Sequence, residues 1–221
     1  MYYFKEQNQS PWIIKYYNEY FKNTPDGFLV EIGVGHTLQG TDNIKEKTLE
    51  GFSSSSPRVG SNTADLLDLG WSGIYVEPVS EYCKEAEIAH DKNIKRLTIV
   101  NKGAGKEKIK LPLYLGDSFV PNNFPDQGYD WIGRIVEIDK TSVILEESGC
   151  PSKIDLMSID VEGFEENVIL GMDFEKFYVK MLIIEINQTS INTIQNLLPS
   201  SFKLLDSDSL NALWINTKKE R

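Results

Sequence analysis

Apolar and polar positions alternate along the chain in short blocks, and these blocks predict a regular succession of strands and helices. The run 27–33 (GFLVEIG) is typical of a buried strand, because it is apolar except for Glu31 and is bounded by glycines. Further segments with strand patterns are 71–77, 96–101, 107–115, 134–138, 153–160, 179–187, 202–206 and 212–217. Segments with apolar residues at helical spacing are 10–21, 61–70, 80–90, 142–148, 165–172 and 190–198.

Strands that alternate with short helices predict an α/β fold, with a mostly parallel sheet covered by helices on both faces. The last two strands, 202–206 and 212–217, are separated only by a short turn, so we expect an antiparallel pair at one edge of the sheet. Pro112 interrupts the strand 107–115 and favours an edge or hairpin position for it.

Two polar stretches, 36–60 and 116–131, interrupt the alternation and have the composition of long loops. No repeat or linker divides the chain, so we expect residues 1–221 to form a single domain. Within it, residues 1–26 should form an N-terminal helical segment, and residues 36–60 a lid-like insertion.

The composition narrows the class of protein. A formal net charge of −10 disfavours nucleic acid as a partner, and the basic segment 102–110 is more typical of a solvated hairpin than of a binding patch. No apolar run approaches the roughly 20 residues of a membrane span, and the N-terminus lacks a secretory pattern. Cys83 and Cys150 have neither metal-ligand nor disulfide spacing. We therefore expect a cytoplasmic protein with no membrane partner, and the sequence leaves its oligomeric state open.

Candidate chemistry gathers where predicted strands end, since ligands of open parallel sheets bind at the carboxyl ends of the strands. Gly33 and Gly35 follow the first strand and would let the backbone approach a ligand. The third glycine of a dinucleotide fingerprint is absent, which weakens a nicotinamide oxidoreductase as an alternative. Glu77 ends the second strand, where a carboxylate can accept both hydroxyl hydrogens of a ribose.

Two carboxylates follow the strand 153–160. Asp160 and Glu162 are two positions apart and so lie on one side of an extended chain. Two close carboxylates raise one another's pKa, which suits one of them to act as a general base, or they can jointly hold a cation. Glu185 and Asn187, after the next strand, could complete an oxygen-rich site for magnesium, although a metal is not favoured because oxygen groups at strand ends are common. His36 is a distant alternative base.

The segments FLVEIG, SNT, GWSGIYVEP, NKGAG and above all IDLMSIDVEGFEENVILGMDFEKFYVKMLIIEIN resemble, in that order, the FkbM family of S-adenosylmethionine-dependent methyltransferases. The resemblance covers about residues 28–190. It implies a Rossmann-like class I methyltransferase fold, a mostly parallel seven-stranded sheet with an antiparallel edge strand.

The resemblance also implies the roles of individual residues. It places Glu31, Gly33 and Gly35 at the methionine part of the cofactor, Glu77 at the ribose, the turn 101–104 at the adenine, and Asp160 and Glu162 near the transferable methyl group. The implied cofactor-binding residues are Glu31, Gly33, Gly35, Asn62, Glu77, Pro78, Gly103, Ala104 and Asp160.

The implied activity is O-methylation of a hydroxyl on a sugar, glycan or natural product, with Asp160 as first candidate for the base and Glu162 as its partner. The alternative is a non-catalytic cofactor-binding or interaction protein on the same fold. Two features depart from the family pattern: the long stretch 36–60 separates the glycine turn from SNT, and Ile186 stands where many relatives have histidine.

Overall fold

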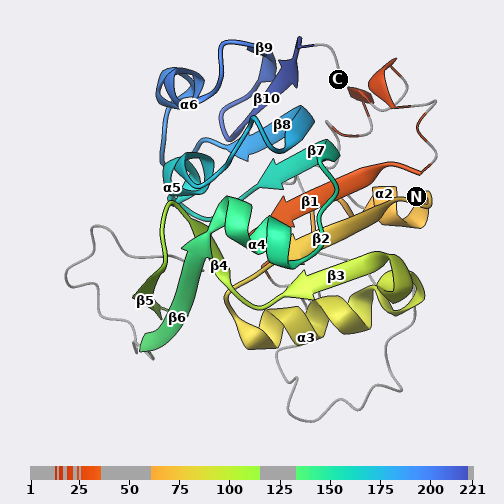
Figure 1. The fold of residues 1–221 in the computed structure, drawn as a ribbon, viewed down its shortest axis with the longest axis vertical. Coiled ribbons are helices and arrows are strands. Elements are labelled where there is room, and N and C mark those ends of the chain that lie inside the picture. The colour runs from red at the N-terminus through yellow and green to blue at the C-terminus, as the bar shows by residue number, and fades with distance from the viewer. Residues whose placement is uncertain are drawn as a thin grey trace.

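The computed structural model describes residues 13, 15, 16, 19–21, 24, 26–35, 61–114 and 133–218, and Figure 1 shows their arrangement. A seven-stranded sheet runs through the centre, in the order β3-β2-β1-β7-β8-β10-β9. Its strands are β1 (Phe28–Ile32), β2 (Ser72–Val76), β3 (Leu97–Val100), β7 (Lys153–Ile159), β8 (Tyr178–Glu185), β9 (Phe202–Ser207) and β10 (Asn211–Asn216).

The first five strands of that sheet pair in parallel, as predicted. At the far edge, β9 and β10 form the expected antiparallel pair. The prediction of an antiparallel edge strand needs one correction, because β10 is antiparallel to both β8 and β9 and lies between them. The outermost strand is therefore β9.

Helices cover both faces of the sheet, which confirms that part of the prediction. They are α2 (Ala64–Asp68), α3 (Ser80–Ala89), the 3-10 helix η2 (Asp91–Arg96), α4 (Thr141–Glu147), α5 (Glu165–Leu170) and α6 (Ile191–Leu197). Apolar side chains of α4, α5 and α6 pack with Val30 and Ile32 of β1 in one core cluster. Those of α2 and α3 pack with Leu29 in a second cluster, so consecutive residues of β1 face opposite sides.

Part of the N-terminal segment belongs to the second core cluster. The described residues between 13 and 20 are helical, in agreement with the predicted helix 10–21 over this part. Ile13 and Phe21 are buried, and the ring of Phe21 meets that of Trp71 edge-on at 5.2 Å between centroids. The predicted loops 36–60 and 116–131, with His36, lie outside the described residues.

A second sheet of three strands is a feature that the sequence pattern did not separate from the main sheet. It has the order β4-β6-β5 and consists of β4 (Gly103–Gly105), β5 (Ile109–Tyr114) and β6 (Gly133–Lys140). Leu113, Val136 and Ile138 pack with Tyr82 of α3 in a third core cluster. Pro112 lies on β5, an edge strand of this sheet, as predicted.

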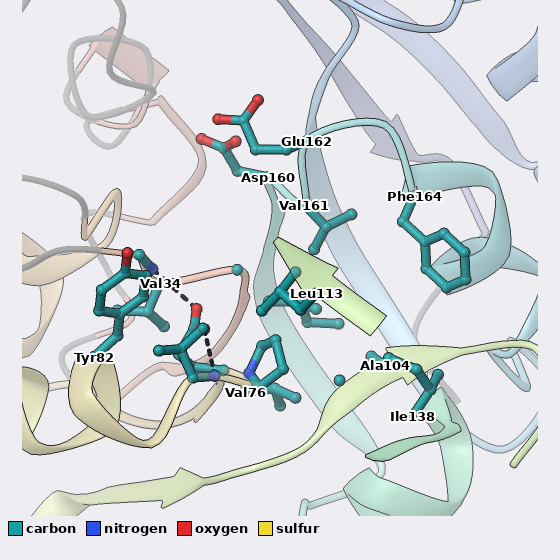
Figure 2. A pocket seen from close by; sticks show the side chains of 17 residues that line it. Val34, Val76, Tyr82, Ala104, Leu113, Ile138, Asp160, Val161, Glu162 and Phe164 are labelled. Carbon is teal, nitrogen blue, oxygen red and sulfur yellow. Dashed lines mark hydrogen bonds between the residues drawn. The ribbon is translucent and has the colours of Figure 1, made fainter. Parts of the chain in front are cut away.

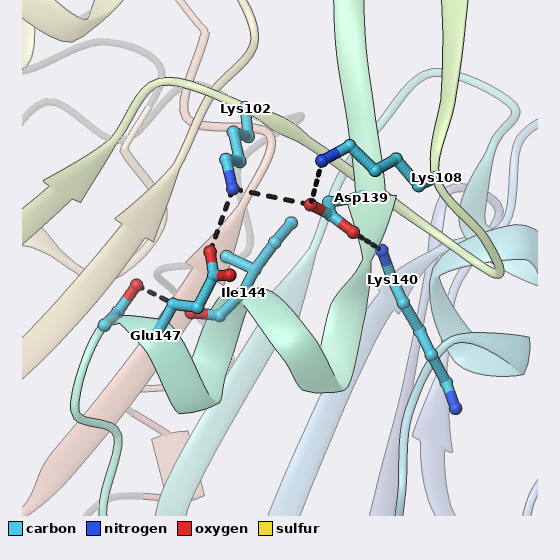
Figure 3. Close-up of polar contacts among 7 residues, drawn as sticks. Lys102, Lys108, Asp139, Lys140, Ile144 and Glu147 are labelled. Atoms are coloured by element: carbon cyan, nitrogen blue, oxygen red, sulfur yellow. Dashed lines mark hydrogen bonds and ion pairs between the residues drawn. The ribbon is translucent and has the colours of Figure 1, made fainter.

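The lysines of segment 102–110 lie on this small sheet and pair with carboxylates, as Figure 3 shows for Lys102 and Lys108. Lys102 contacts Asp139 at 3.4 Å and Glu147 at 3.0 Å, and Lys108 contacts Asp139 at 3.9 Å. The lysine charges are thus matched by neighbouring acids. The predicted hairpin is wrong, because β4 and β5 each pair with β6 and not with each other.

Both cysteines are free thiols. Burial raises the pKa of each thiol to about 12, which favours the protonated form at neutral pH. Among the described helices, none is both long and apolar enough to cross a membrane.

Candidate active site

The site lies at the carboxyl ends of the parallel strands, between β1 and β7. From β1 the chain continues to β2 and β3 on one side of the sheet, and from β7 it continues to β8 on the other. The strand order therefore reverses between β1 and β7, which is where open α/β sheets bind ligands. A backbone hydrogen bond of 2.9 Å, from the Asp160 N–H to the Ile32 carbonyl oxygen, joins the two strand ends.

A pocket opens at this point, and most of the residues predicted for the site line it (Figure 2). They are Gly33, Gly35, Glu77, Pro78, Gly103, Ala104, Asp160 and Glu162. Of the described residues predicted for the site, Glu31 and Asn62 do not line it, because both are buried behind it. The structure thus brings together the segments that follow β1, β2, β3 and β7.

The turn after β1 requires glycine for two different reasons. Gly33 has φ +85°, and a Cβ atom there would lie 1.8 Å from the carbonyl oxygen of Asp160, so only glycine fits against the end of β7. Gly35 has φ +60°, and a Cβ atom there would meet none of the described residues within 4 Å. Gly35 therefore presents bare backbone to the pocket.

Glu77 holds its carboxylate in a fixed position on the pocket wall. Its side chain is 4% exposed, and its two oxygens accept hydrogen bonds from the N–H groups of Gly35 (3.1 Å) and Val79 (2.8 Å). The Asn101 amide donates to the carbonyl oxygens of Glu77 and Pro78, at 3.0 Å each. Asn101 therefore fixes the chain after β2. A carboxylate held in this way is preorganised to accept hydrogen bonds from a diol.

Asp160 and Glu162 form the polar rim of the pocket. Figure 2 shows their carboxylates on the same side, while Val161 between them points towards Leu113, so the predicted one-sided arrangement of the two acids is confirmed. Glu162 has φ +54°, a conformation that costs free energy for a residue other than glycine. Gly163 follows with φ +99°. The chain therefore turns sharply here and keeps both acids at the rim.

Glu165 stabilises this turn. Its side chain is 1% exposed and accepts hydrogen bonds from the N–H groups of Val161 (3.2 Å) and Gly163 (3.0 Å). Burial raises the pKa of the Glu165 carboxyl. The first acidic residue of α5 therefore binds the turn that precedes its own helix.

Glu185, at the end of β8, is the third carboxylate of the rim. Asp160, Glu162 and Glu185 each offer an oxygen within 4.8 Å of the others. Burial, followed by the charges of Asp160 and Glu162, raises the pKa of Glu185 to about 9, so it carries a proton at neutral pH. Burial also raises the pKa of Asp160, against hydrogen bonds from Asn62 and Glu185 that lower it. The Asn187 amide donates to Glu185 at 3.0 Å.

A cluster of this kind has two chemical uses, which are to hold a hard divalent cation or to share protons among its members. Asp160 and Glu185 both receive side-chain amide donors, and Glu185 is protonated next to Asp160. These amide donors hold one oxygen each of Asp160 and Glu185, whereas the buried Glu185 Oε2 has no hydrogen-bond partner among the described residues.

Glu31 has a different environment from the one that the family resemblance implies. It is fully buried, and its carboxylate accepts hydrogen bonds from Ser61 Oγ, from the N–H of Asn62 and from the N–H and hydroxyl of Thr63. Burial raises its pKa to about 7, although these donors lower it. In the described structure, Glu31 binds the turn that precedes α2.

The apolar part of the pocket was missed by the sequence analysis. Figure 2 shows Tyr82 of α3 on one side and Phe164, just before α5, on the other. The remaining apolar walls come from Val34, Val76, Val79, Leu113, Ile138 and Val161. Val76, Tyr82, Leu113 and Ile138 lie on strands or a helix, where an apolar residue is expected for the core, and the other wall residues closely follow or precede such elements, so the sequence carried no separate signal for them.

Comparison with known proteins identifies the family. The model of the methyltransferase FkbM domain matches residues 57–208, which is more than half of the chain. The chain belongs to the FkbM methyltransferase family. The matched range includes Glu77, Asp160 and Glu162, whereas Gly33 and Gly35 precede it. The protein is therefore a methyltransferase of a family that uses S-adenosylmethionine.

Similar solved structures include the pre-rRNA processing protein fibrillarin of Methanococcus jannaschii, at 13% identity and a TM-score of 0.45, over 88% of this chain and 68% of that one. A methyltransferase from Geobacter sulfurreducens has 11% identity and a TM-score of 0.43, over 97% of this chain and 91% of that one. No curated protein sequence matches the chain. The assignment therefore rests on the family match.

The pocket residues fit this cofactor. The bare backbone at Gly35 leaves space for an amino-acid chain, and the fixed Glu77 carboxylate suits the hydroxyls of a ribose. The apolar walls, with Tyr82 and Phe164, suit the flat adenine ring.

Proposed function

We propose that the protein is an O-methyltransferase that acts on a hydroxyl of a sugar, glycan or natural product. The observation that carries this proposal is the position of Asp160 and Glu162, which stand at the rim of the pocket that the glycine turn and Glu77 line. In this proposal the two carboxylates lie beside the region where the methyl group is presented.

In this proposal Glu77 binds the ribose hydroxyls, Gly33 and Gly35 border the methionine moiety, and Gly103 and Ala104 border the adenine. All five line the pocket. When bound, the cofactor supplies a methyl group on a positively charged sulfur, open to in-line attack by an acceptor oxygen. The contribution of the pocket is to hold donor and acceptor in near-attack geometry, away from bulk water.

Asp160 serves as the general base in this proposal. As the acceptor oxygen bonds to the methyl group, its O–H proton passes to the Asp160 carboxylate. Burial raises the pKa of Asp160, which makes it a stronger base than an exposed aspartate. Glu162 is its partner at the rim, and the protonated Glu185 adds no further negative charge.

The charge of the rim favours a neutral acceptor. Asp160 and Glu162 would repel a phosphate or carboxylate group on the acceptor, whereas a sugar hydroxyl can donate hydrogen bonds to both. The overall net charge of −10 acts in the same direction. These features support sugars and other polyols over anionic acceptors.

Calorimetric titration and a transfer assay test the proposal together. We expect S-adenosylmethionine and S-adenosylhomocysteine to bind and NAD not to bind. With methyl-labelled cofactor and a panel of neutral sugars, the wild type should transfer label. Asp160→Asn should bind the cofactor normally. It should transfer the methyl group at least about 100-fold more slowly, because a general base contributes about 10²–10⁴-fold to the rate.

Each other outcome has a defined meaning. Binding of NAD alone would contradict the methyltransferase pocket, and cofactor binding without transfer to any acceptor would favour a non-catalytic binder. Full activity of Asp160→Asn would remove Asp160 as the base. We also expect EDTA to leave the rate unchanged, and a rate restored only by magnesium would assign the three carboxylates to a cation instead.

A further inference from the structure

The side chain of Asn62 reaches the proposed base from behind the pocket. Its amide nitrogen Nδ2 donates to Asp160 Oδ2 at 3.2 Å. Asn62 is 3% exposed and does not line the pocket, so its position differs from that of the residues along the cofactor wall. This contact joins the turn before α2 to the end of β7.

Asn62 is itself held by its backbone. Its N–H donates to Glu31 Oε1 at 2.7 Å, and the neighbouring N–H of Thr63 donates to Glu31 Oε2 at 3.1 Å. The Tyr75 hydroxyl shares a hydrogen bond of 2.6 Å with Ser61 Oγ, which fixes the turn from the side of β2. The turn 61–63 is thus anchored to β1 and β2, two strands of the central sheet.

We propose that Asn62 is a positioning residue for Asp160, and that Glu31 acts through Asn62 by holding the turn 61–63. This inference rests on the proposed function, in which Asp160 is the base. Because the amide engages one carboxylate oxygen, it fixes the orientation of the Asp160 side chain towards the acceptor. Glu31 then contributes to catalysis from the core, without contact with cofactor or acceptor.

The role differs from the cofactor contact that the family resemblance implies for Asn62. A cofactor-binding residue, when truncated, weakens the binding of the cofactor. A residue that orients the base leaves that affinity intact and lowers the rate at saturating cofactor, since misplacement of a reacting group by about 1 Å can cost about 100-fold.

The test compares Asn62→Ala and Asn62→Asp with a matched control, Asn93→Ala. Asn93 is also buried, and its amide donates to Asp68 at 2.8 Å, remote from the pocket lining. For each protein the melting temperature, the affinity for S-adenosylhomocysteine and the single-turnover transfer rate at saturating cofactor are measured. Asn62→Asp keeps the side-chain shape and replaces the amide donor with a carboxyl group next to Asp160, whereas Asn62→Ala removes the donor without adding a charge, so the two variants together separate the hydrogen bond from packing and from charge.

We expect both Asn62 variants to transfer the methyl group roughly 10–100-fold more slowly, with an affinity for S-adenosylhomocysteine within about threefold of wild type. Asn93→Ala should lower the melting temperature by at least as much and keep the wild-type rate. A wild-type rate in both Asn62 variants, or a rate loss confined to weaker cofactor binding, would overturn the inference.

The proposed function can fail independently. If Asp160→Asn is fully active, the base has been misassigned, whatever Asn62 does. If Asp160→Asn is inactive and the Asn62 variants are fully active, the positioning role alone is wrong.

Discussion

At the scale of single residues, Glu31 shows how burial and hydrogen bonding compete at one carboxylate. Burial disfavours the charged form, while donors from Ser61, Asn62 and Thr63 favour it. The balance raises the pKa of Glu31 to about 7 in the folded protein, from an ordinary value of 4.5. The group should therefore change its charge within the physiological pH range.

This shift predicts a pH dependence of stability. Between pH 4.5 and about 7 the folded state binds more protons at Glu31 than the unfolded state, so the free energy of unfolding falls as pH rises through this window. By the conversion of pKa shifts to free energy, the loss is of the order of 3 kcal/mol. Urea denaturation of wild type and Glu31→Gln at pH 5, 6, 7 and 8 measures it.

Glu31→Gln should be less stable than wild type at pH 5, because its amide group faces N–H and hydroxyl donors. Because glutamine does not titrate, the difference in free energy of unfolding between the two proteins should shrink as pH rises to 8. Parallel pH curves for the two proteins would show that Glu31 does not titrate in this range.

At the scale of elements, the turn after β1 combines a structural and a functional glycine. Gly33 packs against the backbone of Asp160, whereas a Cβ atom at Gly35 would contact none of the described residues, and the Gly35 N–H donates to Glu77. The two positions are alike in sequence and in the sign of φ. Only their surroundings separate their roles, so substitutions at the two glycines should have different effects.

Gly33→Ala should destabilise the protein by about 4 kcal/mol or more, because the added methyl group collides with the Asp160 carbonyl oxygen in a conformation that alanine disfavours. Gly35→Ala carries only the conformational cost, about 1–2 kcal/mol. The second variant should fold and bind S-adenosylhomocysteine more weakly, since its methyl group enters the cofactor space. Thermal unfolding and calorimetry measure both effects, and equal stabilities for the two variants would contradict this account of the turn.

At the scale of the whole molecule, the sequence predicts much of the architecture and the rim of the site. Strand periodicity places Asp160, Glu77 and Gly33 after parallel strands, and the topology of such a sheet brings those ends to one edge. The apolar runs that mark the strands are sufficient to predict that these residues share one edge of the sheet. The spacing of Asp160 and Glu162 then predicts that their carboxylates lie on one side.

Other features depend on contacts between distant segments, which periodicity does not encode. Glu31 alternates with Val30 and Ile32 and so faces the side of α2, where the turn 61–63 binds it, although the long stretch 36–60 separates them in sequence. The strand β6 has the apolar pattern of a central strand, yet it pairs with β4 and β5 in the second sheet. In both cases a segment distant in sequence determines the contact: the turn 61–63 for Glu31, and β4 and β5 for β6.

The central claim is that the pocket binds the methyl donor with its reactive group at Asp160 and Glu162. A crystal structure with S-adenosylhomocysteine tests this most directly. The account predicts the ribose hydroxyls within hydrogen-bond distance of the Glu77 carboxylate, the adenine between the apolar walls near Ala104, and the sulfur facing Asp160 and Glu162. A ligand bound elsewhere, or with its sulfur turned away from these two acids, would contradict it.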